Sequence, residues 1–281
     1  MEQNLSKKTR TESDLIGSRE VPESALYGVQ TLRGIENFRI SKFHLNEYPL
    51  FIQALAITKM GAAVANRELD LLTEEQADAI LKACKEILEG KHHDQFPVDM
   101  IQGGAGTTTN MNANEVIANR ALELMGHQRG EYQYCSPNDH VNRSQSTNDA
   151  YPTAIHIGLY YTHLKLVKHF EVLIESFRKK ATEFAHVIKM GRTQLEDAVP
   201  MTLGQTFNGF ASILRHEVKN LDFAAQDFLT VNMGATAIGT GITAEPEYAE
   251  KCIAALRKIT GLGTRKKAKY LIIQYLAFSF A

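Results

Sequence analysis

The segment from Asn142 to Ala154, NRSQSTNDAYPTA, marks the start of the longest helix that the sequence predicts. Ser146 to Asp149 are four consecutive residues of the types that cap helices, and Pro152 follows where a first helical turn accepts proline. A helix is therefore expected to begin inside this segment.

The apolar pattern beyond Pro152 makes this helix unusually long. No further proline occurs before Pro200, and apolar residues recur at helical spacing. They are Ile155, Leu159, Leu166, Phe170, Leu173, Phe177, Phe184 and Ile188. About 36 residues at ~1.5 Å each would extend roughly 54 Å. Such a length indicates a long helical bundle or a coiled coil.

The polar cluster at the start of this helix has two interpretations. A long helix needs its first free N–H groups satisfied, and one Ser, Thr, Asn or Asp does that. A run of hydroxyls and amides at the positive end of a helix is also a natural anion site, which predicts a carboxylate ligand. The segment by itself leaves both interpretations open.

The composition is that of an ordinary globular protein. A chain of 281 residues is long enough for roughly two domains with a sizeable core. It is 44% hydrophobic and 22% charged with a formal net charge of −1, which argues against nucleic acid or an anionic membrane as a partner. No apolar run reaches membrane-spanning length, and the N-terminal residues lack the apolar core of a secretory signal.

The three cysteines, Cys84, Cys135 and Cys252, are widely separated in the sequence. Their spacing indicates neither a disulfide framework nor a zinc site. The sequence therefore predicts a soluble protein of a reducing cytoplasm that holds no metal.

A second polar segment, GGAGTTTNMNANE, occupies residues 103–115. Its glycines allow a tight turn, and Asn112 with Glu115 is expected to cap a helix that runs to about Met125 before Gly126. The Gly-Lys-Ser/Thr ending of a phosphate loop and the glycine spacing of a dinucleotide loop are both missing from it. A glycine turn with a cap and an anion-binding loop remain the two interpretations.

Three other segments have clear helical patterns. Residues 50–67 are small and apolar, as in a packed helix. Thr73 and Gln76 form a capping-box signature that opens a helix ending at Gly90. Residues 246–261 form another helix, with an apolar face and a glycine stop.

The remaining helices define the fold class. The long helix is expected to end at Gly191, where the chain turns back into a second long helix over 204–229. Two long antiparallel helices with a short link make a bundle. The sequence thus predicts a mainly α protein, with an N-terminal, mostly helical domain over 1–145, an incomplete long-helix bundle over 146–262 and a tail over 263–281.

Four motifs resemble the fumarase/aspartase superfamily. They are GAGTTTNMNANEVIAN at 104–119, PNDHVN at 137–142, SQSTND at 144–149 and GRTQLEDAVPMTLGQ at 191–205. The resemblance runs from Arg10 to about Leu262 and implies the family's helical fold. Within the superfamily it is strongest to the aspartate ammonia-lyases, because Gln194 stands where the hydratases usually carry histidine and because of NMGAT at 232–236.

This resemblance implies a reversible anti-elimination that converts L-aspartate to fumarate and ammonia without a cofactor. Proton removal beside the β-carboxylate creates a dianion, so catalysis needs preorganised donors around that carboxylate. By position, the resemblance places the β-carboxylate at Thr107, Ser146 and Thr147, the amino group at Asn148 and Gln194, and the α-carboxylate at Thr193.

None of these six residues is a credible general base, because hydroxyls need activation and amides do not titrate in water. The titratable neighbours His140 and Asp149 have structural interpretations, because His140 can satisfy a loop carbonyl and Asp149 can cap the long helix. In the family the base is a serine in a mobile Gly-Ser-Ser-x-Met-Pro-x-Lys-x-Asn loop, whose lysine and asparagine also hold the α-carboxylate. The sequence contains no such motif.

Residues 263–281, GTRKKAKYLIIQYLAFSFA, depart from the family pattern. A shifted or truncated reading frame explains them better than a membrane-surface anchor, and about a dozen apolar-rich residues cannot span a bilayer. The resemblance implies homotetramers with sites shared among subunits, and this chain by itself is expected to have little or no activity. The alternatives are a fumarate hydratase and a non-catalytic fragment that serves as an assembly partner.

Overall fold

The computed structural model describes residues 8–266, and these are mainly α-helical, as the sequence predicts. The contacts divide the chain into two compact units. The first runs to Gly158 and resumes at Leu229, and the second is Leu159–Phe228. The sequence-based division after residue 145 lies just before the longest helix, whereas the border between the units lies inside that helix.

The helices are α1 (Val29–Asn37), α2 (Pro49–Glu68), α3 (Glu74–Leu88), α4 (Thr107–Leu124), α5 (Thr147–Glu183), α6 (Leu203–Ala225) and α7 (Tyr248–Thr260). The strands are β1 (Thr9–Asp14), β2 (Gly17–Pro22), β3 (Ile188–Thr193), β4 (Glu196–Thr202), β5 (Thr230–Val231) and β6 (Arg265–Lys266). They form three two-stranded sheets, in which β1 pairs with β2 and β3 with β4 in antiparallel fashion, and β5 with β6 in parallel.

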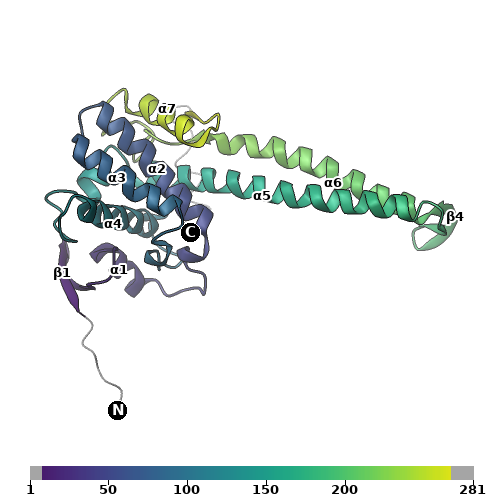
Figure 1. The fold of residues 1–281 in the computed structure, drawn as a ribbon, viewed down its shortest axis with the longest axis horizontal. Coiled ribbons are helices and arrows are strands. Elements are labelled where there is room, and N and C mark those ends of the chain that lie inside the picture. The colour runs from purple at the N-terminus through teal and green to yellow at the C-terminus, as the bar shows by residue number, and fades with distance from the viewer. Residues whose placement is uncertain (1–7, 267–281) are drawn as a thin grey trace, which may run out of the picture. The chain divides into compact units, whose positions relative to one another are not determined.

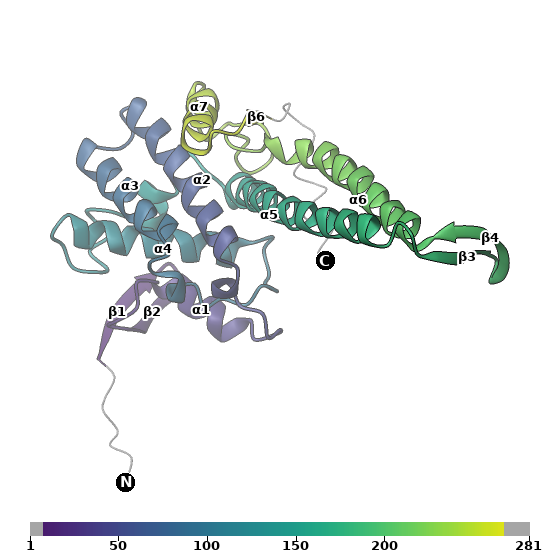
Figure 2. The same ribbon diagram turned by 45° about the vertical axis from the view of Figure 1, so that its right-hand side comes forward.

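The core of the first unit is built around α2. This helix packs against α3 and α7, and α3 packs in turn against α4 (Figures 1 and 2). Small residues let the helices approach closely, and a Cβ placed on Gly61 would lie 2.7 Å from the side chain of Leu256 on α7. The small, apolar composition predicted to form a packed helix therefore serves close helix packing.

Three helix boundaries follow the capping rules read from the sequence. The Thr73 hydroxyl accepts from the Gln76 amide at 3.2 Å, and the Gln76 side chain accepts from the Thr73 amide at 3.2 Å. Gly90 beyond α3 and Gly261 beyond α7 both take positive φ angles, of 88° and 69°. All three predicted boundaries are confirmed, because capping is a local interaction.

The expected start of α4 is wrong. The helix begins at Thr107, so Asn112 and Glu115 lie inside it and are almost fully buried. Gly106 adopts a φ of 93°, which turns the chain into the helix early. The Gln102 side chain then accepts from the Thr109 amide at 2.7 Å and satisfies one of the free N–H groups.

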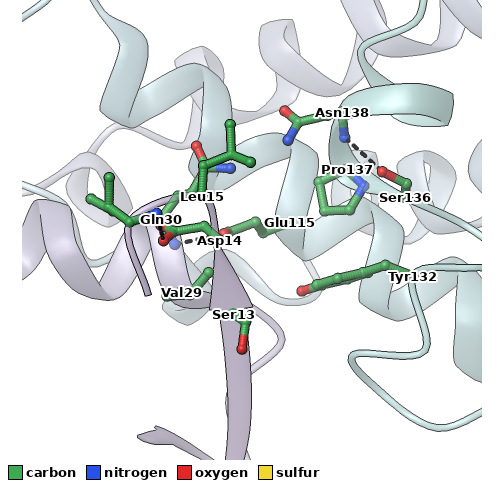
Figure 3. A pocket seen from close by; sticks show the side chains of 11 residues that line it. Ser13, Asp14, Leu15, Val29, Gln30, Glu115, Tyr132, Ser136, Pro137 and Asn138 are labelled. Atoms are coloured by element: carbon green, nitrogen blue, oxygen red, sulfur yellow. Dashed lines mark hydrogen bonds between the residues drawn. The ribbon is translucent and has the colours of Figure 1, made fainter. Parts of the chain in front are cut away.

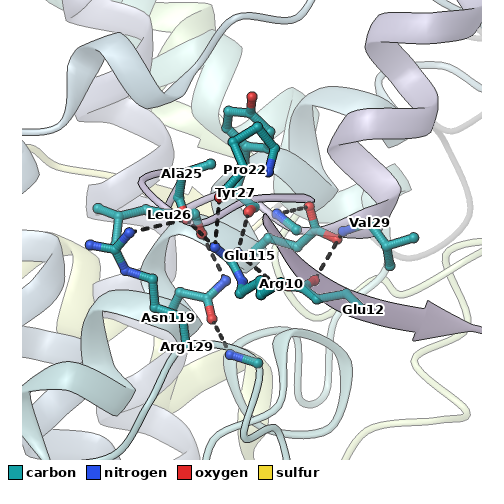
Figure 4. Close-up of polar contacts among 12 residues, drawn as sticks. Arg10, Glu12, Pro22, Ala25, Leu26, Tyr27, Val29, Glu115, Asn119 and Arg129 are labelled. Atoms are coloured by element: carbon teal, nitrogen blue, oxygen red, sulfur yellow. Dashed lines mark hydrogen bonds and ion pairs between the residues drawn. The ribbon is translucent and has the colours of Figure 1, made fainter. Parts of the chain in front are cut away.

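Glu115 caps a different helix. Its carboxylate accepts from the amides of Gly28, Gln30 and Thr31 at 2.8, 2.8 and 3.0 Å, and from the Thr31 hydroxyl at 2.6 Å. It thereby satisfies the N-terminus of α1, a helix that the sequence left undefined (Figure 4). Burial raises the pKa of Glu115 to about 7, while these four donors favour the ionised form.

The second unit contains α6 and most of α5, which run side by side with the β3–β4 hairpin at one end (Figure 1). A cluster of aromatic rings joins the two helices near the hairpin, with centroid separations of 5.6 to 6.3 Å. It consists of Phe177, Phe184, Phe207 and Phe210. The predicted pair of long antiparallel helices is confirmed, and α5 has 37 residues.

Gly191 does not end the long helix, which is a correction to the sequence-based expectation. The helix ends at Glu183, and Gly191 lies in β3, where the pairing with β4 becomes irregular between Met190 and Arg192. The start of α6 crosses the end of α5 so closely that a Cβ on Gly204 would lie 2.4 Å from the Ala181 carbonyl oxygen. The β3–β4 hairpin makes the connection between the two helices.

The beginning of the predicted tail packs on the first unit. Thr264 is buried, and its carbonyl oxygen accepts from Arg257 Nε at 2.6 Å. Residues 267–281, the rest of that tail, lie outside the described residues. Across 8–266, no helix is long and apolar enough to cross a membrane.

Candidate functional site

Four of the six sequence-predicted residues come together where α4 and α5 begin. Thr107 is the first residue of α4, and Ser146, Thr147 and Asn148 form the start of α5. Asn110, one turn into α4, donates from Nδ2 to Thr147 Oγ1 at 3.1 Å. Two helix N-termini, each with a positive end, therefore lie next to each other.

Gly106 makes this approach of the two helices possible. A Cβ at this position would lie 2.4 Å from the Tyr151 ring, which belongs to the first turns of α5. The glycine at the end of the loop before α4 thus allows the contact with α5.

Thr193 and Gln194 belong to the second unit, where they lie at the tip of the β3–β4 hairpin. Both side chains are exposed, and Gln194 and Leu195 take positive φ angles of 49° and 71° that close the tight turn. The cluster of the first unit therefore holds only the residues expected to bind the β-carboxylate, together with Asn148.

Ser146 caps α5. Its hydroxyl oxygen accepts from the Asn148 amide at 3.2 Å, and the Asp149 carboxylate accepts from the Ser146 amide at 2.8 Å. The capping interpretation is therefore confirmed at Ser146 and Asp149. It does not exclude ligand binding, because a hydroxyl that accepts at its oxygen still has a proton to donate.

The glycine-rich segment 232–241 is tied to the same helix start. Asn148 donates from Nδ2 to the Ala237 carbonyl oxygen at 2.9 Å, and Asp149 accepts from the Thr236 amide at 2.9 Å. Asp149 is fully buried, and this burial raises its pKa to about 6. Its contacts assign it to holding the segment against α5.

A buried lysine that sequence reasoning missed lies behind the cluster. Lys59, on α2, has only 1% of its surface exposed. Its ammonium donates to Asn110 Oδ1, Asn142 Oδ1 and Gln145 Oε1 at 2.8, 3.0 and 2.8 Å. Burial lowers the pKa of Lys59 to about 7, while the charge of Asp149 acts in the opposite direction. The available signal was a single charged residue in the middle of an otherwise apolar helical segment.

Thr107 and His140 are engaged in local contacts. The Thr107 hydroxyl donates to the Gly104 carbonyl oxygen at 2.6 Å, within its own loop. His140 Nδ1 accepts from the Ser136 amide at 2.7 Å inside the π-helical turn Pro137–Val141. Desolvation lowers the pKa of His140. His140 thus has a structural contact, but its ring nitrogen accepts from a backbone N–H, which differs from the loop carbonyl that the sequence suggested.

A separate cavity of about 590 Å³ lies in the first unit and includes none of the six predicted residues. Figure 3 shows Asp14, Glu115, Tyr132 and Asn138 among the side chains that line it. Both carboxylates are already used, because Asp14 pairs with Arg33 at 2.9 Å and Glu115 caps α1. The cavity therefore offers no free charged group for chemistry.

Metal and thiol chemistry find little support in the described part of the chain. Among residues 8–266, no three His, Cys, Asp or Glu side chains are grouped to hold a metal ion. Cys84, Cys135 and Cys252 are free and buried, and burial raises the pKa of the Cys84 thiol to about 12. Such thiols are poor nucleophiles.

Comparison with known proteins identifies the class. Residues 17–275 match the family described as Lyase, and the chain belongs to this family. The match reaches into the 263–281 stretch. The resemblance to the fumarase/aspartase superfamily is thereby confirmed.

Relatives within the class carry the name aspartate ammonia-lyase. The protein of that name from Escherichia coli strain K12 is 54% identical over 92% of this chain, and that from Pseudomonas canavaninivorans is 56% identical over 90%. This chain covers 54% and 53% of their lengths, so it spans about half of the curated relatives it matches.

Solved structures share the fold. A fumarate lyase:delta crystallin from Brucella melitensis superposes with a TM-score of 0.89 at 48% identity, covering 97% of this chain and 58% of the other. A class II fumarase from Schistosoma mansoni superposes with a TM-score of 0.83 at 35% identity, covering 90% of this chain and 53% of the other.

Proposed function

We propose that this chain carries the dicarboxylate-binding part of an aspartate ammonia-lyase site, whose reaction is the reversible anti-elimination of ammonia from L-aspartate to give fumarate. The carrying observation is that the starts of α4 and α5 lie together, with Ser146, Thr147 and Asn148 at the second of them. The identity of 54–56% to relatives of that name supports the same assignment.

The carboxylate end of the substrate is assigned to the helix starts. Loss of a proton beside the β-carboxylate places a second negative charge on that group. Hydroxyl donors and helix dipoles that are already oriented stabilise this charge without reorganisation. Ser146 and Thr147 both accept hydrogen bonds at oxygen, and each retains a proton for the carboxylate. Thr107 joins them only after its hydroxyl turns away from the Gly104 carbonyl.

The amino group of the substrate is assigned to Asn148. Its Nδ2 donates to the Ala237 carbonyl oxygen, so its Oδ1 is the atom that can accept from an amine. Gln194 is proposed as the second amine contact and Thr193 as the α-carboxylate contact, on the strength of the family resemblance. We assign no catalytic base, metal or cofactor to the described residues.

The proposal also covers the association of this chain with further copies and its location in the cell. Large apolar side chains are exposed in the second unit, with Val172, Ile213 and Phe223 at 64%, 60% and 83% exposure. Exposed apolar residues on long helices support association with further copies of the chain, for which the family resemblance suggests a tetramer. Three free, buried cysteines support a cytoplasmic location.

The test measures ligand binding and substrate conversion by the purified protein. L-aspartate, L-malate and succinate are titrated by calorimetry, and fumarate formation is followed by ultraviolet absorbance. We expect binding of L-aspartate and succinate, and weaker binding of both in Thr147→Val. Thr58→Val serves as the matched control, because Thr58 is buried on α2 and its hydroxyl donates to the Ala54 carbonyl oxygen of the same helix. Absence of dicarboxylate binding would refute the assignment.

A fumarate hydratase is the second candidate, since a class II fumarase shares the fold. Conversion of L-malate in preference to L-aspartate would favour it. A chain that binds ligand without converting it can also be an assembly partner. Mixing it with a full-length relative and measuring co-assembly by light scattering distinguishes that case.

A further inference from the structure

We propose that Lys59 is a positioning residue, which orients the Asn110 amide so that the Thr147 hydroxyl must accept from it and keeps its proton for a carboxylate ligand. Because the hydroxyl is assigned to a carboxylate, this role rests on the proposed function. Lys59 itself touches no ligand in this arrangement, and it acts through Asn110.

The first step is that the lysine ammonium can donate hydrogen bonds but cannot accept them. An ammonium group has three donors and no acceptor. Lys59 Nζ meets three amide oxygens, on Asn110, Asn142 and Gln145, at 2.8, 3.0 and 2.8 Å. A flipped amide would direct its NH₂ group at a buried cation, which is strongly unfavourable. Each of the three amides therefore has one allowed orientation.

The second step passes this orientation to the hydroxyl. Since Asn110 Oδ1 faces Lys59, its Nδ2 is left as the donor, and it donates to Thr147 Oγ1 and to Asn142 Oδ1, both at 3.1 Å. A hydroxyl has one proton and acts as acceptor when an N–H points at its oxygen. The Thr147 proton is thus left to donate, which is what a carboxylate requires.

The third step concerns the loop that leads into α5, which the same contacts hold in place. Asn142 Oδ1 also accepts from Asn114 Nδ2 at 3.1 Å, so Asn142 Nδ2 turns to the Gln145 carbonyl oxygen at 3.2 Å. Gln145 Nε2 donates to the Val141 carbonyl oxygen at 2.9 Å. The same lysine therefore orders the loop immediately before Ser146 and Thr147.

A purely structural role for Lys59 makes a different prediction. If the lysine only fills space and satisfies three amides, its replacement changes stability and leaves the direction of the bond at Thr147 unaffected. Asn110→Asp separates the two roles. The aspartate keeps an oxygen toward Lys59 and gains an ion pair, but its other oxygen can only accept. It therefore loses the bond to Asn142 Oδ1, and the Thr147 hydroxyl must donate its proton to it.

The binding test is a double-mutant cycle with succinate, followed by calorimetry. Thr147→Val should weaken binding by about tenfold or more in the parent protein, as for a hydrogen bond to a charged group. In the Asn110→Asp background the same change should cost less than about threefold, since the proton is already withdrawn. Any repulsion from the new carboxylate is common to both members of that background. Equal losses in the two backgrounds would overturn the proposal.

A second measurement needs no ligand. In the parent protein, nuclear Overhauser contacts should join the Asn110 side-chain NH₂ to the Thr147 methyl group, and Lys59→Met should abolish them. Lys59→Arg, which keeps a buried donor cation, should retain them. Persistence of the contacts in Lys59→Met would refute the role of Lys59. If the parent binds no succinate, the proposed function fails, while these contacts still decide whether Lys59 orients Asn110.

Discussion

Replacing Gly106 with alanine tests how closely the starts of α4 and α5 approach each other. Gly106 has a φ of 93°, in the region that side chains avoid. A Cβ there would also lie 2.4 Å from one Tyr151 ring carbon and 2.5 Å from two others. Tyr151 in turn packs edge-on against Phe51, with ring centroids 5.7 Å apart, so the ring has limited room to retreat.

The expected cost has two parts. A left-handed backbone costs an alanine about 1–2 kcal/mol. Carbon atoms pack at roughly 3.5–4.0 Å, so the ring or the loop must move by about 1 Å, and such overpacking costs about 1–3 kcal/mol. Gly106→Ala should therefore lower the free energy of unfolding by about 2–5 kcal/mol.

Gly90 provides the matched control for urea denaturation. It has a similar φ of 88°, but a Cβ there would meet nothing within 4 Å. Gly90→Ala should cost only the backbone part, about 1–2 kcal/mol. In a Tyr151→Ala background the two alanine substitutions should become equally costly, to within about 0.5 kcal/mol. The packing argument fails if Gly106→Ala costs no more than Gly90→Ala in the parent protein.

Two predictions concern buried or paired carboxylates. Glu115→Gln should lower the free energy of unfolding at pH 8 by about 2–4 kcal/mol, because an amide accepts on one side only and leaves an N–H such as that of Gln30 without an acceptor. The exposed Glu171→Gln should stay within about 0.5 kcal/mol, and equal effects in urea denaturation would contradict the capping role. The hydrogen bond from Arg120 lowers the pKa of Glu86 to about 2, so its stabilisation is complete above pH 4.5 and is lost as the pH falls toward 2. Glu86→Gln should reduce the pH dependence of the free energy of unfolding over that range. If the variant keeps the same pH dependence as the parent protein, the Glu86–Arg120 pair is not its cause.

Local patterns in the sequence determined most of the helices. The caps at Thr73 and Ser146, the long apolar run after Pro152 and the glycine stop at Gly261 each act within a few residues of chain. Such interactions are set by neighbours in sequence, so a single sequence is enough to predict them. The family motifs likewise located the residues at the start of α5.

Tertiary contacts determined the elements that the sequence misplaced. Glu115 resembled a cap of its own helix, yet its carboxylate reaches the Gly28 amide, 87 residues away. Gly191 resembled a helix stop, but it lies in β3, where a Cβ would sit 2.9 Å from the Val199 carbonyl oxygen of the partner strand. Neither partner can be read from local pattern, because each depends on how distant segments pack.

The candidate site also combines features that local sequence determined with features that only tertiary contacts determined. The sequence by itself identified the hydroxyls and the amide at the start of α5, because motif and helix cap coincide there. The tertiary structure alone placed α4 beside them and put Lys59 behind Asn110 and Asn142. A buried charge is stable only where folded partners surround it, so its role becomes visible only once the fold brings those partners together.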